Sequence, residues 1–592
     1  MGKHIRFQWG NLHRGPKLQW WTTLNFPLAA VILSEAVFQV ERRISRGVAR
    51  AFRARSLAPL VQTRGFGMTH QLEFQTDPLR KLRIPLHSWL LGMTICMFCL
   101  LPPAVAQDIA SFEKRITLKK LDNGLTVLIC ERPEAPVFSF YTHVDAGSVQ
   151  DPLDKTGLAH MFEHMAFKGT ETIGTKDYAS EKVALEKVEQ AYVAYLRERD
   201  KRIDRDDAKV KQLEAAWQDA IKQANQYVIP NQFTEVIERN GGENLNASTN
   251  YDETNYFYSL PANRFELWAY LESSRFLHPV MREFYKERNV VIEERRMRTD
   301  SNPIGRLLEQ FTTAAFQASQ YHRPTIGWMS DLNSFSATDA ENFFHEYYIP
   351  SNMVLTVVGD VKASEAMPVI EKYFGRIPSH EKPDERITNE PPQNSERRVL
   401  LQEMAQPLYL EGYHRPDYLS PDDAVYDGIA DLMSEGRTSR LYRALVRDKK
   451  IASDAAGFTG LPGNKYPHLF AFYAFCMPGH KPQEMATAIH EEIEKLKTQD
   501  ISDDELKMVK TRAKANLIRS LGSNSGLAFE LGMNQARYDD WRELFRQVDR
   551  IDKVSKADIR RVANKTFTDS NRTVGIIETA PPPSAHPSKG GE

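Results

Sequence analysis

Two histidines and a glutamate with metal-binding spacing lie early in the main body of the chain. His160, Glu163 and His164 form an H-x-x-E-H sequence. The Ala, Leu, Met and Phe residues around them favour a helix, and Gly169 is a suitable C-terminal stop. At about 100° per residue, Glu163 and His164 fall within roughly 60° of His160, on either side of it, so the three side chains share one helical face. This arrangement predicts half of a hydrolytic metal site of the zinc type, in which two imidazoles bind the ion and the carboxylate reaches a water molecule. Two packed core histidines are the alternative.

A site of this kind needs a third protein ligand. Residues 284–297 have helical spacing, and Glu287 and Glu294, seven positions apart, fall within roughly 20° on one face. They could supply the missing ligand and a carboxylate that supports it, or they could form a solvated acidic stripe. His143 is a rival ligand, but in the strand predicted for residues 136–147 a packed histidine is the more ordinary outcome.

The sequence on either side of these candidate ligands predicts two β-hairpins and one helical hairpin. An Asn-Gly turn predicts a β-hairpin over residues 116–129, and residues 241–261 predict a second one. The first strand of this second hairpin carries small polar side chains, so it could accept an extended peptide at a sheet edge or simply face solvent. Residues 181–227 predict a helical hairpin with a charged turn, and its charges indicate either a solvated face or an element that gates the site.

An internal repeat indicates two similar halves. Residues 336–358 predict an N-capped helix, a turn and a strand, and residues 555–577 repeat this pattern 219 positions later. Four positions are identical in the two copies: Ser336 and Ser555, Asp339 and Asp558, Ser351 and Ser570, and Asn352 and Asn571. We therefore predict an α+β fold of two similar halves, each a mixed sheet packed with helices, and only the first carries H-x-x-E-H.

The predicted domain limits follow from these patterns. The ranges are an amino-terminal extension with a signal peptide (1–106), a zinc-bearing domain (111–379) with a helical insertion (181–227), a polar linker (380–396), a second domain (397–579) and a disordered tail (580–592).

The amino-terminal segment differs in composition from the rest. Residues 1–106 hold fourteen Lys and Arg against four Asp and Glu, whereas the remainder has eleven more acidic than basic residues. A mildly acidic body argues against nucleic acid as a partner. The basic run, the uncharged apolar stretch at 84–106 and the small residues before Ala106 predict a secretory signal peptide cleaved after that residue, with a retained membrane anchor as the alternative. Translation from Met68 instead of Met1 would give a more ordinary signal peptide.

Export places the mature chain outside the cytoplasm, in the periplasm if the source is bacterial, without stable membrane insertion. Only Cys130 and Cys476 remain after cleavage, and two cysteines are too few for a disulfide framework.

These motifs together resemble the pitrilysin (insulinase-like) zinc metallopeptidases, and most closely their branch of two-domain chains similar to the mitochondrial processing peptidase. The resemblance covers residues 111–578. It rests on the string H-M-F-E-H-M-A-F-K-G-T from His160, the Asn246-Ala247 pair, the helix E-R-N-V-V-I-E-E from Glu287, and the Ser-Asn pair at 351–352 ahead of a strand.

Membership would imply a clamshell of two α/β-roll halves that holds one Zn²⁺ per chain. The zinc ligands carried over are His160, His164 and Glu294, with Glu287 as the supporting carboxylate. Glu163 would be the general base, which takes a proton from water and delivers it to the leaving amine of a peptide bond.

The resemblance also implies groups that bind substrate and a partner. Asn246 and Ala247 match the edge strand that pairs with the substrate backbone. In this family an Arg and a Tyr from a second-half helix often bind the substrate carbonyl; Arg447 matches the Arg, whereas the Tyr position falls on Ser453. We therefore expect a second chain to complete the site, in a homodimer or in a heterodimer with a zinc-less homologue.

The implied function is that of a zinc-dependent endopeptidase acting on peptides or small unfolded proteins. Two other classes stay open: a non-catalytic or partner-dependent subunit of a peptidase-like assembly, and a zinc-binding or zinc-delivery protein. Retention of every predicted zinc residue favours the enzyme.

Overall fold

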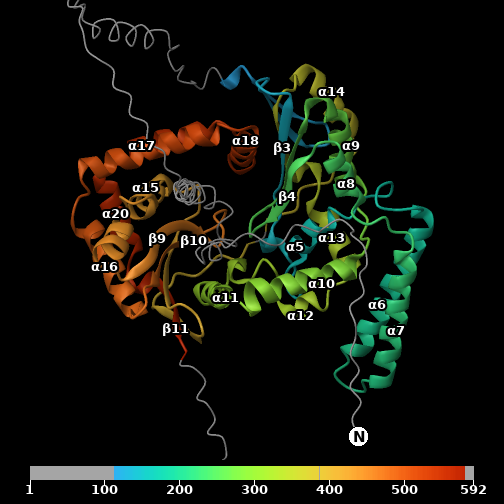
Figure 1. Ribbon diagram of the computed structural model, residues 1–592, viewed down its shortest axis with the longest axis horizontal. Coiled ribbons are helices and arrows are strands. Elements are labelled where there is room, and N and C mark those ends of the chain that lie inside the picture. Colours follow the sequence, from blue (N-terminus) through green and yellow to red (C-terminus); the bar gives the residue numbers. More distant parts are fainter. Residues whose placement is uncertain (1–111, 386, 581–592) are drawn as a thin grey trace, which may run out of the picture.

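The computed structural model describes residues 112–385 and 387–580. The amino-terminal extension with its predicted signal peptide (1–106) and the tail beyond residue 580 lie outside this range. Within the described residues, no helix is both long and apolar enough to cross a membrane. The chain forms two sheets, each packed with helices, which confirms the predicted α+β architecture of two similar halves (Figure 1).

The first sheet has six strands in the order β1-β2-β6-β3-β5-β4. β1 and β2 pair antiparallel across Asn123-Gly124, where Gly124 has a φ of +94°, and this confirms the predicted hairpin. β2 and β6 run parallel while the other neighbours are antiparallel, so the sheet is mixed. The strands are β1 (Ile116–Lys120), β2 (Thr126–Glu131), β3 (Val137–Val144), β4 (Glu243–Thr249), β5 (Thr254–Pro261) and β6 (Met353–Gly359).

Alternation along β3 sends its side chains to two different layers. Phe138 and Phe140 contact Trp268, with ring centroids 5.5 and 5.2 Å apart, and belong to the core beneath the helices of the first half. Tyr141 points to the opposite face, where it contacts Phe529. The helices of the first half are α5 (Leu158–Met165), α6 (Tyr178–Arg199), α7 (Asp207–Asn225), α8 (Gln232–Arg239), α9 (Phe265–Leu277), α10 (Phe284–Arg295), α11 (Pro303–Ala315), α12 (Met329–Leu332), α13 (Ala337–Tyr347) and α14 (Ala363–Phe374).

The second sheet has five strands in the order β7-β11-β8-β10-β9, and it is mixed as well, because β7 and β11 run parallel. Its strands are β7 (Arg397–Glu403), β8 (Leu408–Arg415), β9 (Ala452–Leu461), β10 (His468–Cys476) and β11 (Arg572–Thr579). Its helices are α15 (Asp423–Ser434), the π-helix η6 (Tyr442–Asp448), α16 (Pro482–Thr498), α17 (Asp503–Ser520), α18 (Asn524–Tyr538), α19 (Glu543–Lys553) and α20 (Lys556–Thr566).

The predicted repeat is confirmed as a pair of equivalent units. α13 leads into β6 and α20 leads into β11, and each helix begins with a capping box, formed by Ser336 with Asp339 and by Ser555 with Asp558. In each box the serine accepts from an amide of the first turn while the aspartate accepts from the serine amide.

Each sheet is covered on one face by a helix from the other half. α11 packs on β7 and β11, and α18 packs on β3 and β6. Glycines make both contacts close: a Cβ at Gly412 or Gly575 would come within 3.0 Å of Phe311 of α11, and a Cβ at Gly532 of α18 would come 2.9 Å from the hydroxyl of Thr356. The two halves are therefore joined through reciprocal helix–sheet contacts.

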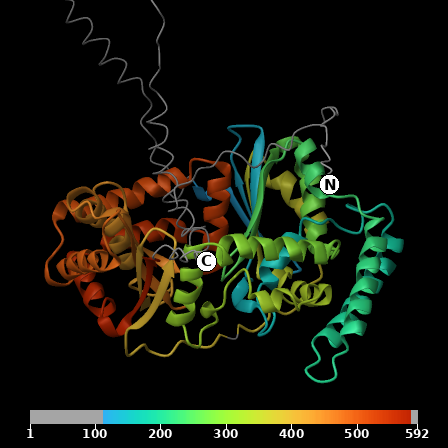
Figure 2. The same ribbon diagram turned by 60° about the horizontal axis from the view of Figure 1, so that its bottom comes forward.

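α6 and α7 pack along each other as a helical hairpin that projects from the body of the first half (Figures 1 and 2). Its first helix lies against α10, which Tyr285 and Arg288 connect to Tyr192 of α6. Tyr285 and Arg288 lie roughly 160° and 100° around α10 from Glu287. The hairpin therefore supports α10 from a side well removed from Glu287 and Glu294.

Candidate metal centre

Two neighbouring helices carry the predicted metal-binding residues. His160, Glu163 and His164 lie on α5, and Glu287 and Glu294 lie on α10, which packs against α5. The 3.6-residue period places each set on one face, as the spacing predicts. The structure turns these two faces toward each other.

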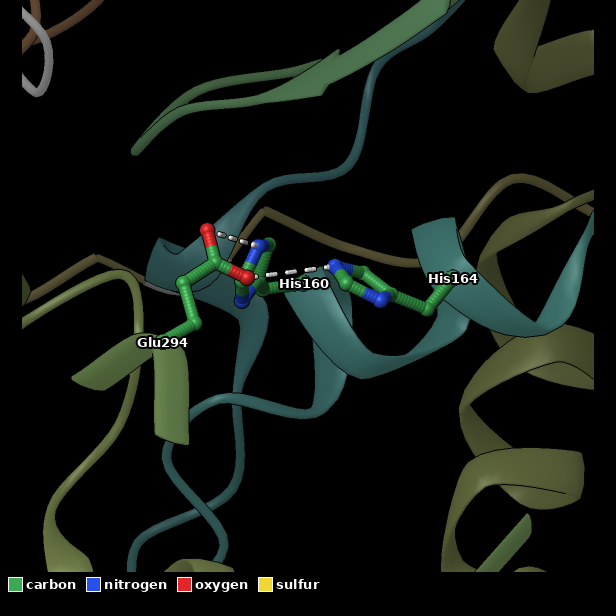
Figure 3. Close-up of side chains that lie close together, drawn as sticks. All are labelled: His160, His164 and Glu294. Atoms are coloured by element: carbon green, nitrogen blue, oxygen red, sulfur yellow. Dashed lines mark ion pairs between the residues drawn. The ribbon is translucent and has the colours of Figure 1, made fainter. Parts of the chain in front are cut away.

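Glu294 faces both imidazole rings, with one carboxylate oxygen directed at each (Figure 3). One carboxylate oxygen is 3.8 Å from Nε2 of His160, and the other is 3.5 Å from Nε2 of His164. These separations exceed a hydrogen bond, and they approach the roughly 3.4 Å between ligand atoms held tetrahedrally by Zn²⁺ at about 2.1 Å. Among the described residues, these three side chains are the one group of His, Cys, Asp or Glu whose donor atoms could hold a metal ion, all within 4.8 Å. The donor set suits Zn²⁺.

Glu287 lies on the far side of the His164 ring from Glu294. Its Oε1 is 3.0 Å from Nδ1 of His164, and its Oε2 is 2.5 Å from Nζ of Lys168. Burial acts to raise the pKa of Glu287, but the hydrogen bonds from His164 and Lys168 outweigh it and hold that pKa at about 2. Burial acts to lower the pKa of His164, but the hydrogen bond with Glu287 and the nearby carboxylates outweigh it and raise that pKa. Because the ionised Glu287 accepts the Nδ1 proton, His164 would give up its Nε2 proton on binding a metal.

His160 has a different environment. It is buried, and burial, followed by the nearby charges of His164 and Arg298, sets its pKa well below the ordinary value. A neutral imidazole is the form that binds metal. Its Nδ1 has no hydrogen-bond partner among the described residues, so His160 lacks the support that Glu287 gives to His164. Arg298 pairs with Glu294 at 2.9 Å, which places one cation beside the three candidate ligands.

Glu163 stands on the same face of α5 but outside the ligand group. Burial raises the pKa of Glu163. The charges of His164 and Arg298 and a hydrogen bond with Thr249 lower this pKa to a smaller extent, and the charge of Glu294 adds to the rise. A raised pKa brings a carboxylate closer to neutral pH, where a general base is most effective. Thr249 ends β4, the edge strand that packs beside α5.

The predicted substrate-binding residues occupy two separate places. Asn246 and Ala247 lie in β4, which pairs with β5 on one side and, within the described residues, ends the sheet on the other. Arg447 lies in η6, packed with β9 and α16 of the second half, and its exposed guanidinium is paired with the neighbouring Asp448 at 2.6 Å. Ser453, at the position of the expected Tyr, bonds to Gln406. The recorded contacts of Arg447 thus lie within the second half.

His143 is a packed residue. It is buried in β3, where Nδ1 bonds to Asn255 and lies 3.7 Å from Glu253. This removes it as a rival ligand and agrees with the ordinary role of a strand histidine.

One residue of the site's scaffold escaped sequence reasoning. α5 begins after Gly157, which has no side chain to cap the helix. Asp151 caps it from six residues upstream: its carboxylate accepts from the amides of Gly157 (2.7 Å) and Ala159 (2.9 Å). The one available signal is an acidic residue shortly before a helix start, which is too common to single out.

Comparison with known protein families matches two family descriptions to this chain. The description "Insulinase (Peptidase family M16)" matches residues 126–196 and 220–328. The description "Peptidase M16 inactive domain" matches residues 334–513. Together they cover more than half of the chain, and the break at 197–219 falls in the α6–α7 hairpin.

Relatives of known name or structure agree with these matches. Zinc protease PqqE of Helicobacter pylori is 28% identical over 507 residues, 83% of this chain and 98% of its own length. An uncharacterized zinc protease of Bacillus subtilis, YmxG, is 21% identical over 76% of this chain and 94% of its own. The crystal structure of a protease from H. pylori superposes with a TM-score of 0.65 at 26% identity, covering 78% of this chain and 99% of that one. The periplasmic protease PqqL from Escherichia coli shares the fold, with a TM-score of 0.59 at 18% identity over 80% of this chain and 49% of that one.

Proposed function

The chain belongs to the insulinase family of peptidases, family M16, and on that premise we propose that it is a zinc-dependent endopeptidase of the H-x-x-E-H type. Its substrates are peptides or small unfolded proteins, a class suited to an edge strand that can pair with an extended backbone. One Zn²⁺ per chain is held by His160, His164 and Glu294.

The arrangement of the three ligand side chains carries this proposal. Two helices present two ring nitrogens and one carboxylate at near-tetrahedral spacing, and Glu287 orients the His164 ring from behind. A purely structural set of polar groups at this range would instead close into direct hydrogen bonds.

The catalytic roles follow from the position of each side chain. Zn²⁺, when bound, polarises a peptide carbonyl and lowers the pKa of a water molecule to roughly 7. Glu163, with its raised pKa, accepts the proton of the attacking water and then delivers it to the leaving amine. β4 holds the substrate backbone beside α5, with Asn246 and Ala247 in the pairing strand.

Glu163→Gln is the decisive variant. It keeps the shape of the side chain but cannot accept a proton, so turnover of an unstructured peptide should fall by about 10²- to 10⁴-fold. Because Glu163 lies outside the ligand group, the variant should still bind one Zn²⁺ per chain, measured by elemental analysis.

Glu293→Gln provides the matched control, since Glu293 is adjacent to Glu294 but is exposed and paired with Arg296. It should retain full activity. Loss of zinc in Glu163→Gln would make Glu163 a structural residue, and a zinc-loaded wild type without chelator-sensitive cleavage would identify a zinc-binding protein instead.

The same proposal extends to assembly and location. A second chain, in a homodimer or a heterodimer with a zinc-less homologue, supplies the carbonyl-binding groups, because Arg447 is paired with Asp448 inside the second half. The mature chain acts after export, in the periplasm of a bacterial source. Full activity of a chain that stays monomeric by light scattering would contradict the assembly, and an uncleaved amino terminus would contradict the export.

A further inference from the structure

A buried arginine, Arg282, joins three segments next to the proposed metal centre: the start of α10, the helix α6 and the loop that follows α5. Arg282 directly precedes the N-cap of α10 and is 1% exposed. Its Nε and Nη2 donate to Glu181 of α6 at 2.6 and 2.8 Å. Its other donors reach three carbonyls in the loop that follows α5, at Lys168 (2.7 Å), Thr170 (3.0 Å) and Ile173 (3.1 Å). All five N–H groups of the guanidinium are therefore used.

The loop after α5 is shaped around this guanidinium. Gly169 and Gly174 both have a φ of +93°, in the left-handed region that favours glycine. A Cβ at Gly174 would lie 2.6 Å from Nη1 of Arg282, and a Cβ at Gly169 would lie 3.0 Å from the same atom. Thr170 also forms a β-bridge with Pro279, just ahead of Arg282. The backbone thus closes around the guanidinium as far as glycine allows.

Lys168 connects this loop to the metal centre. Its carbonyl accepts from Arg282, while its Nζ lies 2.5 Å from Oε2 of Glu287. The other oxygen of Glu287 is bonded to Nδ1 of His164. A shift of the loop would therefore move Lys168, change the contacts of Glu287 and turn the His164 ring.

We propose that Arg282 and Glu181 are positioning residues, which fix the spacing between the two ligand-bearing helices and so set the affinity for Zn²⁺. This inference rests on the proposed function and adds a role for the α6–α7 hairpin: its first helix supplies the buried carboxylate that holds Arg282. In this role the hairpin acts through the scaffold of the centre.

Arg282→Lys tests the fork geometry of the guanidinium. Lysine keeps the charge but has three donors on one nitrogen, so it cannot satisfy the carboxylate and three carbonyls together. We expect the Kd for Zn²⁺ to rise about 10- to 100-fold, as is usual when a group that orients a ligand is altered. Glu181→Gln, which keeps the shape and removes the charge, should raise it in the same direction by a smaller factor.

The control is a second buried arginine of comparable bonding. Arg415 is 2% exposed and bonds to Asp423 (2.5 Å), Thr459 (2.6 Å) and the carbonyl of Pro416 (3.0 Å) within the second half. Arg415→Lys should lower the melting temperature, as Arg282→Lys does, but leave the Kd for Zn²⁺ unchanged.

The measurement is titration of Zn²⁺ into the apo full-length mature protein in competition with a chromophoric chelator, with the melting temperature recorded for every variant. Wild-type affinity in Arg282→Lys, or an equal loss of affinity in Arg415→Lys, would overturn the inference. If Arg282→Lys does not fold, Glu181→Gln decides, since an unchanged Kd there also overturns it. A wild type that binds no Zn²⁺ would refute the proposed function itself, whereas a zinc-binding wild type with unaffected variants refutes only the positioning role.

Discussion

The carboxyl group of Asp151, which caps the helix α5 of the proposed metal centre, should change its charge near neutral pH. Asp151 is 3% exposed, and its two oxygens accept from the amides of Gly157 and Ala159 at the start of α5. The pKa of Asp151 is raised to about 7, because the effect of burial outweighs the lowering by these two hydrogen bonds and by the charge of Arg323. The start of the helix that carries both histidines therefore responds to pH. Asp151→Asn removes the titrating group and keeps the size of the side chain.

The sign of the effect follows from the folded and unfolded pKa values. A carboxyl whose pKa rises from 3.8 to about 7 on folding stabilises the folded state by ~4 kcal/mol below pH 3.8, because it binds its proton more tightly there. That contribution decreases as the pH rises from about 4 to 7, and it is absent above pH 7. Asparagine has no such dependence. It also loses one of the two acceptors, a constant cost of about 1–3 kcal/mol.

The assay is urea denaturation of the apo protein in chelator, followed by tryptophan fluorescence at intervals between pH 4.5 and 8.5. The chelator keeps the protein free of metal, so that the protons released on metal binding do not add to the pH dependence. The difference in unfolding free energy, wild type minus Asp151→Asn, cancels the other titrating groups. It should decrease by roughly 3 kcal/mol between pH 4.5 and 7.5 and then level off. A difference that stays flat, or one that increases with pH, would refute the reasoning.

Two further variants test the support of His164 and the junction between the halves. Glu287→Gln removes the charge that holds Nδ1–H of His164, so the Kd for Zn²⁺ should rise about 10- to 100-fold in the chelator competition; an unchanged Kd would show that the His164 ring needs no such partner. Gly532→Ala places a Cβ 2.9 Å from a threonine hydroxyl of β6, so it should lower the melting temperature. In the control Gly428→Ala the new Cβ meets nothing closer than 3.7 Å. This control should raise the melting temperature, because alanine is favoured over glycine in a helix by about 1 kcal/mol. Equal shifts in the two proteins would mean that α18 does not pack tightly on the first sheet.

Local periodicity was sufficient to place the two carboxylates of α10 on one face, but not to distinguish their positions. Glu287 and Glu294 have the same spacing pattern, and each could face a ligand histidine. The rotation of α10 about its own axis, which packing against α5 and α6 sets, directs Glu294 at Nε2 of both rings and Glu287 at Nδ1 of His164. Such rotations depend on contacts between distant segments, so they do not follow from the residues of one helix.

Apart from the Asp151 cap of α5, the contacts that sequence reasoning missed join distant parts of the chain. Arg282 bonds to Glu181, 101 positions away, and to a loop more than 100 positions away. The packing of α11 on the sheet of the other half has one signal in the sequence. Gly412 and Gly575 interrupt strands β8 and β11, and glycine within a strand marks the close approach of another element. A sequence shows the glycines that allow a close contact, but it does not show which side chain or helix makes that contact.

The second half contributes to the scaffold of the proposed metal centre although it carries none of its candidate ligands. α10 leads through the π-helix Arg296–Asp300 directly into α11, which packs on β7 and β11 of the second sheet. Arg295 secures this junction, since its guanidinium bonds to Glu309 of α11 at 2.8 and 3.1 Å. Glu294 therefore belongs to a segment anchored on the second half, whereas α5, with its two histidines, is embedded in the core of the first. The position of Glu294 relative to His160 and His164 thus follows in part from how the two halves are joined through α11.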